Sequence, residues 1–189
     1  GGVICRRISC SSHGSSMTWI PLEHLLSHGR PPAHLVAVRG GVPIPFGRFQ
    51  SDVAAAAALL GGSRRAALAC DDSYVFAVGL LALLHAGTEV LLPPNAQPGT
   101  VAELDMRVVN DAVIAAAPAA SYRFGPLDIE RGKVVFHTSG STGAPKLIEK
   151  PLWMLQRESD TIDQALGAHL GSGPVHATVS HQHLYGLAF

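Results

Sequence analysis

Short apolar runs alternate with helical patterns along most of the chain, and this alternation limits the possible folds more than any other feature. Runs typical of strands cover 34–39, 66–70, 89–92, 134–137 and 175–179. Helical spacing of apolar residues covers 54–60, 74–86 and 152–170. Strand–helix alternation of this kind favours an α/β fold in which mostly parallel sheets are flanked by helices.

Turn and cap residues set the expected ends of several elements. Gly40-Gly41 predicts a hairpin in which 42–46 returns as a strand, and the prolines of that run place it at a sheet edge. Ser51 or Asp52 is the expected cap of the first helix. The run 71–73, Asp-Asp-Ser, supplies cap chemistry for the second helix.

The pattern is weaker in the middle of the chain and near its end. We expect a short helix at 100–106, a short strand at 112–115 and a loop with one extended piece at 121–131. Pro151 suits the first turn of the helix at 152–170, and Tyr185 is expected to open another helix.

Composition excludes several classes of protein. The 189 residues are 47% hydrophobic and 15% charged, which excludes intrinsic disorder. Lys+Arg and Asp+Glu are both 14, so the basic excess of a typical nucleic-acid-binding protein or of a charge-driven membrane-binding protein is absent. The most apolar stretch, 75–92, is interrupted by His85, Gly87 and Glu89, so no membrane span is expected.

The cysteines and the ends of the sequence indicate compartment and domain organisation. Three sparse cysteines do not make a disulfide framework, so a reducing, cytoplasmic compartment is expected. Residues 1–16 are interpreted as a leader or cloning remnant before a native start at Met17. Because the sequence stops inside an apolar run, 17–189 is expected to be the N-terminal portion of a longer, truncated domain.

The segment with the most evident chemical use is 134–146, VVFHTSGSTGAPK. An apolar strand runs into a bend of Thr, Ser and Gly residues that Pro145 and Lys146 close. Glycines admit positive φ, and successive N–H groups in such a bend bind anions. The hydroxyl groups and the lysine add donors and a positive charge suited to phosphate oxygens. The segment therefore predicts a phosphate-binding loop.

Two well-known phosphate-binding patterns do not fit this loop. A Walker A loop requires G-x-x-x-x-G-K-[ST] leading into a helix, whereas here Lys146 comes three residues after Gly143 and Pro145 disfavours the helix start. The glycine spacing also differs from the dinucleotide fingerprint G-x-G-x-x-G. A kinase-like P-loop protein is therefore a weak alternative.

The run TSGSTGAPK resembles the phosphate-binding signature of the adenylate-forming (AMP-binding) superfamily. That superfamily includes acyl- and aryl-CoA synthetases, luciferases and the adenylation domains of peptide synthetases. The resemblance implies the N-terminal part of the adenylate-forming enzyme fold. It also implies that the outer phosphates of ATP are held by a set of loop residues: Thr138, Ser139, Gly140, Ser141, Thr142, Gly143 and Lys146.

A second segment agrees with this resemblance. Residues 183–187, HLYGL, are similar to the H-x-x-G-L motif that family members carry after the next helix and strand. The resemblance implies that His183 lines the carboxylate pocket, together with Tyr185 and Gly186, and that Lys146 and His183 are the catalytic residues of this part of the chain. A softer match is 74–93, a buried helix followed by a strand that ends in proline.

Two departures from the family pattern stand out. Leu147 follows the motif lysine where many members have glycine, and Gln182 stands where an aromatic residue is common. The run HQHLYGL is similar to ligases of aryl-polyene-type pigment clusters. His176, His181 and His183 are close in sequence, but no cysteine or carboxylate joins them at a ligand spacing, so no metal site is expected.

The resemblance implies a two-step reaction that needs ATP and Mg²⁺. A carboxylic acid, aryl first and fatty second, becomes an acyl-adenylate, and a thiol of CoA or a carrier protein then takes the acyl group. The adenine, ribose and lid-lysine motifs would lie in the C-terminal portion of the same enzyme, so 1–189 alone is expected to be inactive. The alternative is a non-catalytic phosphate-binding or partner-docking module.

Overall fold

The computed structural model describes residues 4–6, 20–138, 146–170, 174–175, 180–182 and 187. Its largest sheet has five strands in the order β6-β4-β5-β7-β8. Their bounds are β4 Arg65–Leu68, β5 Glu89–Leu92, β6 Val108–Val109, β7 Lys133–Thr138 and β8 Lys146–Pro151. The strands β4, β5, β6 and β7 pair in parallel, and β8 runs antiparallel to β7 at the edge. The expected mostly parallel sheet is therefore confirmed.

Both faces of β4, β5 and β7 are buried, which explains why these strands read as apolar runs, whereas the edge strand β8 is largely exposed. On one face Ala67, Leu91 and Val135 are register partners and pack with Leu104 and Met106. The alternate residues of the same strands point to the other face and join the main core, among them Leu68, Val90, Leu92, Val134 and Phe136. Strands buried on both sides in this way are typical of the parallel sheets of α/β folds.

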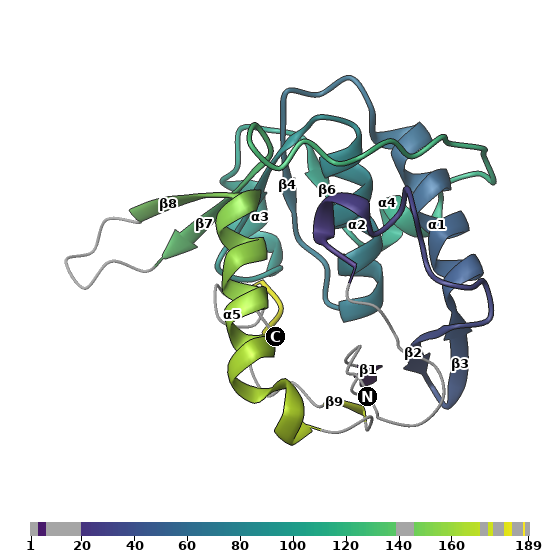
Figure 1. The fold of residues 1–189 in the computed structure, drawn as a ribbon. Helices are drawn as coiled ribbons and strands as arrows, with labels where there is room; N and C mark the ends of the chain where they lie inside the picture. The colour runs from purple at the N-terminus through teal and green to yellow at the C-terminus, as the bar shows by residue number, and fades with distance from the viewer. Residues whose placement is uncertain are drawn as a thin grey trace.

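The helices pack against the strands of both sheets. Their bounds are η1 Leu22–His24 (a 3-10 turn), α1 Phe46–Leu60, α2 Ser73–His85, α3 Pro98–Ala102, α4 Asp111–Ala115 and α5 Leu152–Leu170. Figure 1 shows α1 and α2 side by side, with α5 next to the β7–β8 hairpin. The expected helices at 74–86 and 152–170 are confirmed within one residue at each end.

A smaller, antiparallel sheet has the order β3-β2-β1-β9. Its strands are β1 Ile4–Arg6, β2 Leu35–Arg39, β3 Val42–Pro45 and β9 Pro174–Val175. The predicted hairpin is confirmed: Gly40 and Gly41 have φ of 55° and 81°, and β3 is an edge strand. Residues 4–6, which belong to the expected leader or cloning remnant 1–16, pair with both β2 and β9.

The cap expected for the first helix was wrong. The helix α1 begins at Phe46, after Pro45, and no side chain caps it. The Ser51 hydroxyl instead donates to the Gly47 carbonyl oxygen, 2.9 Å away, from inside the helix. A serine in a helix interior can use its hydroxyl for a hydrogen bond within the helix, so the presence of such a residue alone does not mark a helix boundary.

Two further expectations were wrong at short elements. Residues 112–115 lie in the helix α4 and not in a strand, because the Asn110 side chain accepts a hydrogen bond from Val113 N and caps that turn. Pro151 is the last residue of β8, and α5 begins one residue later, at Leu152. The short helix expected at 100–106 lies slightly earlier, as α3.

Charged residues of alternating sign line the amino edge of the large sheet. Glu89 contacts Arg65 on β4, and Lys133 Nζ on β7 lies 2.9 Å from both Glu89 Oε2 and Glu149 Oε2. Burial alone would raise the pKa of Glu89, but the hydrogen bonds and charges of Lys133 and Arg65 outweigh it and lower that pKa. Ion pairs therefore join the strands at the amino edge. At the opposite, carboxyl edge, segments from distant parts of the sequence contact one another.

Candidate functional site

The carboxyl ends of parallel strands mark where ligands bind in open α/β sheets. Here β4 ends at Leu68, β5 at Leu92 and β7 at Thr138, and their parallel pairing brings these ends to one edge. The expected phosphate-binding loop follows β7 directly. The carboxyl edge is therefore the expected place of a functional site.

The β7–β8 hairpin brings the two ends of the expected phosphate-binding loop together. Thr138, the last residue of β7, is the register partner of Lys146, the first residue of β8. Residues 139–145 connect them. The Lys146 side chain is exposed, which suits a cation that meets a diffusing polyanion. In Figure 1 the two strands reach out from the rest of the molecule on one side.

Most residues of the expected loop lie outside the described residues. These are Ser139, Gly140, Ser141, Thr142 and Gly143. The structure places the backbone of Thr138 and the whole of Lys146, and it brings these two residues opposite each other. Assignment of the remaining loop residues to phosphate binding stays a prediction.

The second expected group, His183, Tyr185 and Gly186, also lies outside the described residues. The residues on either side of it are described. His181 and Gln182 form a turn at the carboxyl edge, and Leu187 packs against the main hydrophobic core. The assignment of His183, Tyr185 and Gly186 to the carboxylate pocket therefore stays a prediction.

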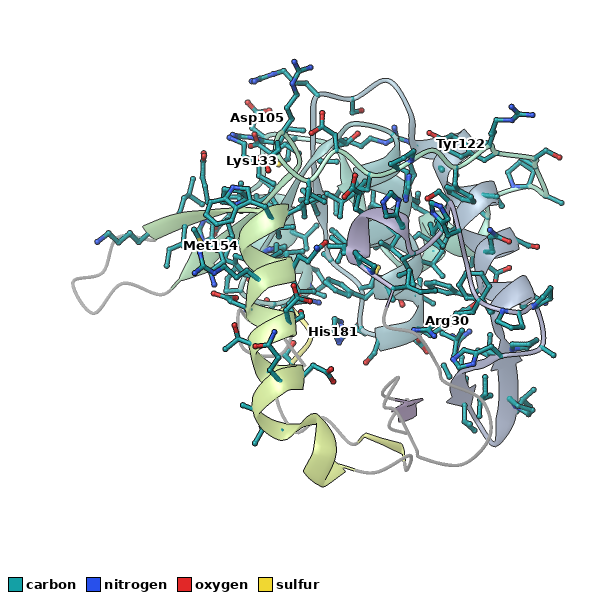
Figure 2. The ribbon with its side chains drawn as sticks, viewed as in Figure 1. Arg30, Asp105, Tyr122, Lys133, Met154 and His181 are labelled. Atoms are coloured by element: carbon teal, nitrogen blue, oxygen red, sulfur yellow. The ribbon has the colours of Figure 1, made fainter. Side chains whose placement is uncertain are left out.

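One backbone carbonyl holds the turn at 180–182. The Cys70 oxygen lies 2.8 Å from His181 Nε2 and accepts a hydrogen bond from Gln182 Nε2 over 2.6 Å. The other ring nitrogen of His181, Nδ1, lies 3.2 Å from the Ser73 hydroxyl, and its ring centroid is 4.5 Å from that of Phe76. His181 thus lies at the start of α2, and Figure 2 shows it toward the opposite end of the parallel strands from Lys133.

The start of α2, to which this turn is attached, is a dense hydrogen-bonded junction. Asp72 Oδ1 accepts from Tyr74 N and Val75 N and so caps the helix. The Asp111 carboxylate accepts from the backbone N–H groups of Asp71 and Asp72. Three segments are joined here, which gives the turn at 180–182 a rigid support.

Cys70 contributes its backbone and not its thiol. Burial, followed by the nearby carboxylates of Asp111, Asp71 and Asp72, raises the pKa of the Cys70 thiol far above its ordinary value. The thiol therefore stays protonated at neutral pH, which excludes it as a nucleophile. Among the described residues, no group of three His, Cys, Asp or Glu side chains is arranged to hold a metal ion.

Two apolar clefts, of about 250 and about 300 Å³, lie beside α2. Leu22, Leu25, Arg30, Leu80 and Leu81 line both of them. A polar cleft of about 360 Å³ lies on another side, where the Tyr74 hydroxyl donates to Asp52 over 2.7 Å. Within the described part of the chain, no helix is both long enough and apolar enough to cross a membrane.

Sequence reasoning missed three contributors to the carboxyl edge: the Cys70 carbonyl, the Ser73 hydroxyl and the Gln182 amide. Ser73 was recognised only as part of a helix cap, and Gln182 only as a departure from the family pattern. The residues in contact are separated by 108 to 112 positions along the chain, so no local sequence pattern predicts these contacts.

No protein-family model matches the sequence, and no curated protein matches it. Several solved structures match by fold. The N-terminal subdomain of NpsA from Klebsiella oxytoca matches with a TM-score of 0.52 and 16% identity, over 65% of this chain and 39% of that chain. The o-succinylbenzoate CoA synthetase MenE from Bacillus subtilis matches with a TM-score of 0.63 and 12% identity, over 89% of this chain and 41% of that chain.

A third structure, VinN in complex with L-aspartate, matches with a TM-score of 0.56 and 16% identity, over 79% of this chain and 52% of that chain. The chain thus spans between 39% and 52% of the length of these structures. At such low identity the likeness shows the fold alone. The expected fold, the N-terminal part of the adenylate-forming enzyme fold, is confirmed.

Proposed function

We propose that the chain is part of an enzyme that uses ATP to activate a carboxylic acid as an acyl-adenylate. The acyl group then passes to the thiol of CoA or of a carrier protein. The single observation that best supports this is the pairing of Thr138 with Lys146 at the carboxyl edge, because it closes the TSGSTGAPK segment into a loop at the place where α/β sheets bind ligands.

The chemical role proposed for this chain is to stabilise negative charge on the phosphates. In the first step a carboxylate oxygen of the acid bonds to the α-phosphorus of ATP, and the bond from that phosphorus to the departing pyrophosphate breaks. Lys146 and the hydroxyl and N–H groups of 138–143 stabilise the negative charge on the pyrophosphate. Mg²⁺, when bound with the nucleotide, neutralises phosphate oxygens. In the second step the thiol sulfur attacks the acyl carbon and AMP leaves.

The exposed Lys146 fits this role, since an ammonium group on an extended strand beside the loop can follow the phosphates as they depart. His183, with Tyr185 and Gly186, is assigned to the carboxylate pocket by the family resemblance. The motifs for adenine, ribose and the lid lysine belong to the C-terminal portion of the same enzyme. Residues 1–189 alone are therefore inactive in this proposal.

An aromatic acid is the favoured substrate class. MenE is an o-succinylbenzoate CoA synthetase, and an NpsA structure holds 3-hydroxybenzoyl-AMSN, so the compounds named for two proteins of this fold both contain an aromatic ring. A fatty acid is the second class. The compartment proposed for the enzyme is the cytoplasm, where the buried Cys70 thiol stays reduced.

The test is acid-dependent exchange of pyrophosphate into ATP by the full-length protein, measured with a panel of benzoic, hydroxybenzoic and medium-chain fatty acids. We expect exchange with at least one aromatic acid and only background exchange with residues 1–189 alone. No exchange with any acid, in a protein that still binds ATP, would leave the phosphate-binding module as the better account. Exchange by residues 1–189 would contradict the assigned division of the site.

A further inference from the structure

We propose that the two apolar clefts beside α2 form a binding site for a free medium-chain carboxylic acid, whose tail enters the larger cleft and whose carboxylate binds Arg30. The larger cleft measures about 300 Å³ and the smaller about 250 Å³. Small-molecule sites are mostly apolar hollows of about 300–1,000 Å³ with a few polar groups. The described residues that line the two clefts do not include Lys146, so this site is distinct from the expected phosphate-binding loop.

The clefts exist because α2 is apolar on nearly every side. The helix packs against β4 and β5, while Ala77, Leu80 and Leu81 line the larger cleft. Ala77 and Leu80 are only partly buried. A helix face that meets water normally carries polar residues. The apolar residues on this side of α2 therefore favour an apolar occupant of the cleft.

Arg30 gives the site a preference for an anion. It lines both clefts, and none of the described residues that line them is an aspartate or a glutamate. Figure 2 shows Arg30 toward the same end of the molecule as His181 and away from Lys133. The charge of Arg30 therefore has no acidic counterpart among the described residues that line the clefts.

The surroundings of Arg30 make a carboxylate a suitable partner. Burial lowers the pKa of the Arg30 guanidinium, so its charge is partly removed from water. An arginine still stays protonated at neutral pH. A guanidinium has several N–H donors and can bind both oxygens of a carboxylate in addition to the contacts that it already makes. A bound acid would thus complement a charge that water solvates poorly.

The larger cleft suits the tail of the acid. Three aromatic rings line it, and the ring centroid of Phe49 lies 6.4 Å from that of Phe46 and 5.9 Å from that of Tyr74. The Tyr74 hydroxyl donates to Asp52, so the ring contributes mainly apolar surface to this cleft. Each methylene group buried here adds affinity. The volume, at the lower end for small-molecule sites, favours a medium chain over a long one.

Two pairs of variants of the full-length protein separate the head from the tail. Arg30→Met removes the guanidinium and keeps an unbranched side chain; its control is Arg48→Met, because Arg48 is an exposed arginine that lines the polar cleft instead. Ala77→Phe fills the larger cleft. Its control is Ala58→Phe, at an exposed position of α1.

The first measurement is calorimetric titration with decanoate and with decanol, in the absence of ATP. Wild type should bind decanoate about 10-fold more tightly than decanol, because only the acid forms a charge-assisted pair with Arg30. Arg30→Met should weaken decanoate binding by about 10-fold and decanol binding by less than about two-fold, and Arg48→Met should change neither. Equal affinity of wild type for the two probes would overturn the proposal.

The second measurement tests the place of the tail. Ala77→Phe should weaken the binding of both probes by at least about 10-fold, because the added ring takes up the space of the tail. Ala58→Phe should leave both affinities unchanged. If Ala77→Phe does not fold, the titration of Arg30→Met decides. No decanoate binding by wild type would overturn the proposal and would favour an apolar segment of the full-length protein as the occupant of the clefts.

A third measurement separates this site from acid activation. Decanoate should bind equally well with and without a saturating aromatic acid that supports pyrophosphate exchange, and Arg30→Met should leave that exchange unchanged. Competition between the two acids, or a loss of exchange in Arg30→Met, would overturn the separate site. If no acid supports exchange, the proposed function fails, and the calorimetric titrations still decide whether the clefts bind a carboxylic acid.

Discussion

Arg39 Nε lies 2.7 Å from Asp72 Oδ2, so β2 is tied to the first turn of α2 by the same carboxylate that caps the helix. The Arg39 side chain is 51% exposed, and an ion pair so open to water contributes little. Asp72 therefore stabilises the fold mainly by capping α2. Its neighbour Ser73 in turn contacts His181, so the cap also supports the turn at the carboxyl edge.

Replacement of Asp72 therefore separates the cap from the ion pair. Asp72→Ala should lower the free energy of unfolding of the full-length protein by about 1–2 kcal/mol, as for loss of a helix cap. Asp72→Asn, which keeps the capping oxygen, and Arg39→Ala, which removes only the ion pair, should each cost less than about 0.5–1 kcal/mol. Urea denaturation measures all three. A cost in Arg39→Ala equal to that in Asp72→Ala would contradict this division.

Gly132 is expected to tolerate no side chain. A Cβ there would lie 2.7 Å from the Asp128 carbonyl oxygen and 2.5 Å from Leu152 Cδ1, and Leu152 is fully buried. Gly132→Ala should destabilise the full-length protein by about 1–3 kcal/mol through overpacking.

Gly99 provides the contrast to Gly132. It lies in α3, and a Cβ added there would meet nothing within 4 Å. Gly99→Ala should stabilise the protein by about 0.4–1 kcal/mol, because alanine restricts the unfolded chain more than glycine does. Both changes are measurable by thermal unfolding. A stability loss in both variants would show that the room for a Cβ at these two positions does not determine the change in stability.

Glu89 gives the stability a predictable dependence on pH. Its pKa in the folded protein lies below the ordinary value of 4.5, so ionised Glu89 stabilises the fold at higher pH. This stabilisation is lost as the pH falls through the lowered pKa. Wild type should therefore lose stability more steeply than Glu89→Gln between about pH 5 and pH 3. Chemical denaturation at a series of pH values checks this, with Glu149→Gln as a more exposed control; parallel profiles for wild type and Glu89→Gln would contradict it.

Long buried runs made most of the fold predictable from sequence. The strands β5 and β7 and the helix α2 could be predicted because each has an unbroken apolar centre and is bounded by polar residues or by residues that break or cap it. Residues 112–115 are too few to distinguish a helical from an extended period, and the cap at Asn110 decided the outcome. For α1 the cap-type residue Ser51 misled, because its hydroxyl bonds within the helix.

The candidate site was predictable only in part, and for a physical reason. The segment from Thr138 to Lys146 is contiguous, so its residue types alone predicted a loop, and the register of β7 with β8 agrees with that. The contact of Gln182 with Cys70 depends on folding across 112 positions. A local pattern contains no signal for such a contact.

The most direct test of the account is the replacement of Lys146 in the full-length protein. Lys146→Ala should lower kcat of acid-dependent pyrophosphate exchange by about 100-fold, as for loss of one charge-stabilising group, and change acid affinity by less than about two-fold. The control Lys150→Ala, which removes a lysine of the same strand farther from the loop, should retain the wild-type rate within about two-fold. Equal losses of rate and acid affinity in Lys146→Ala, or equal losses of rate in the two variants, would contradict the central claim.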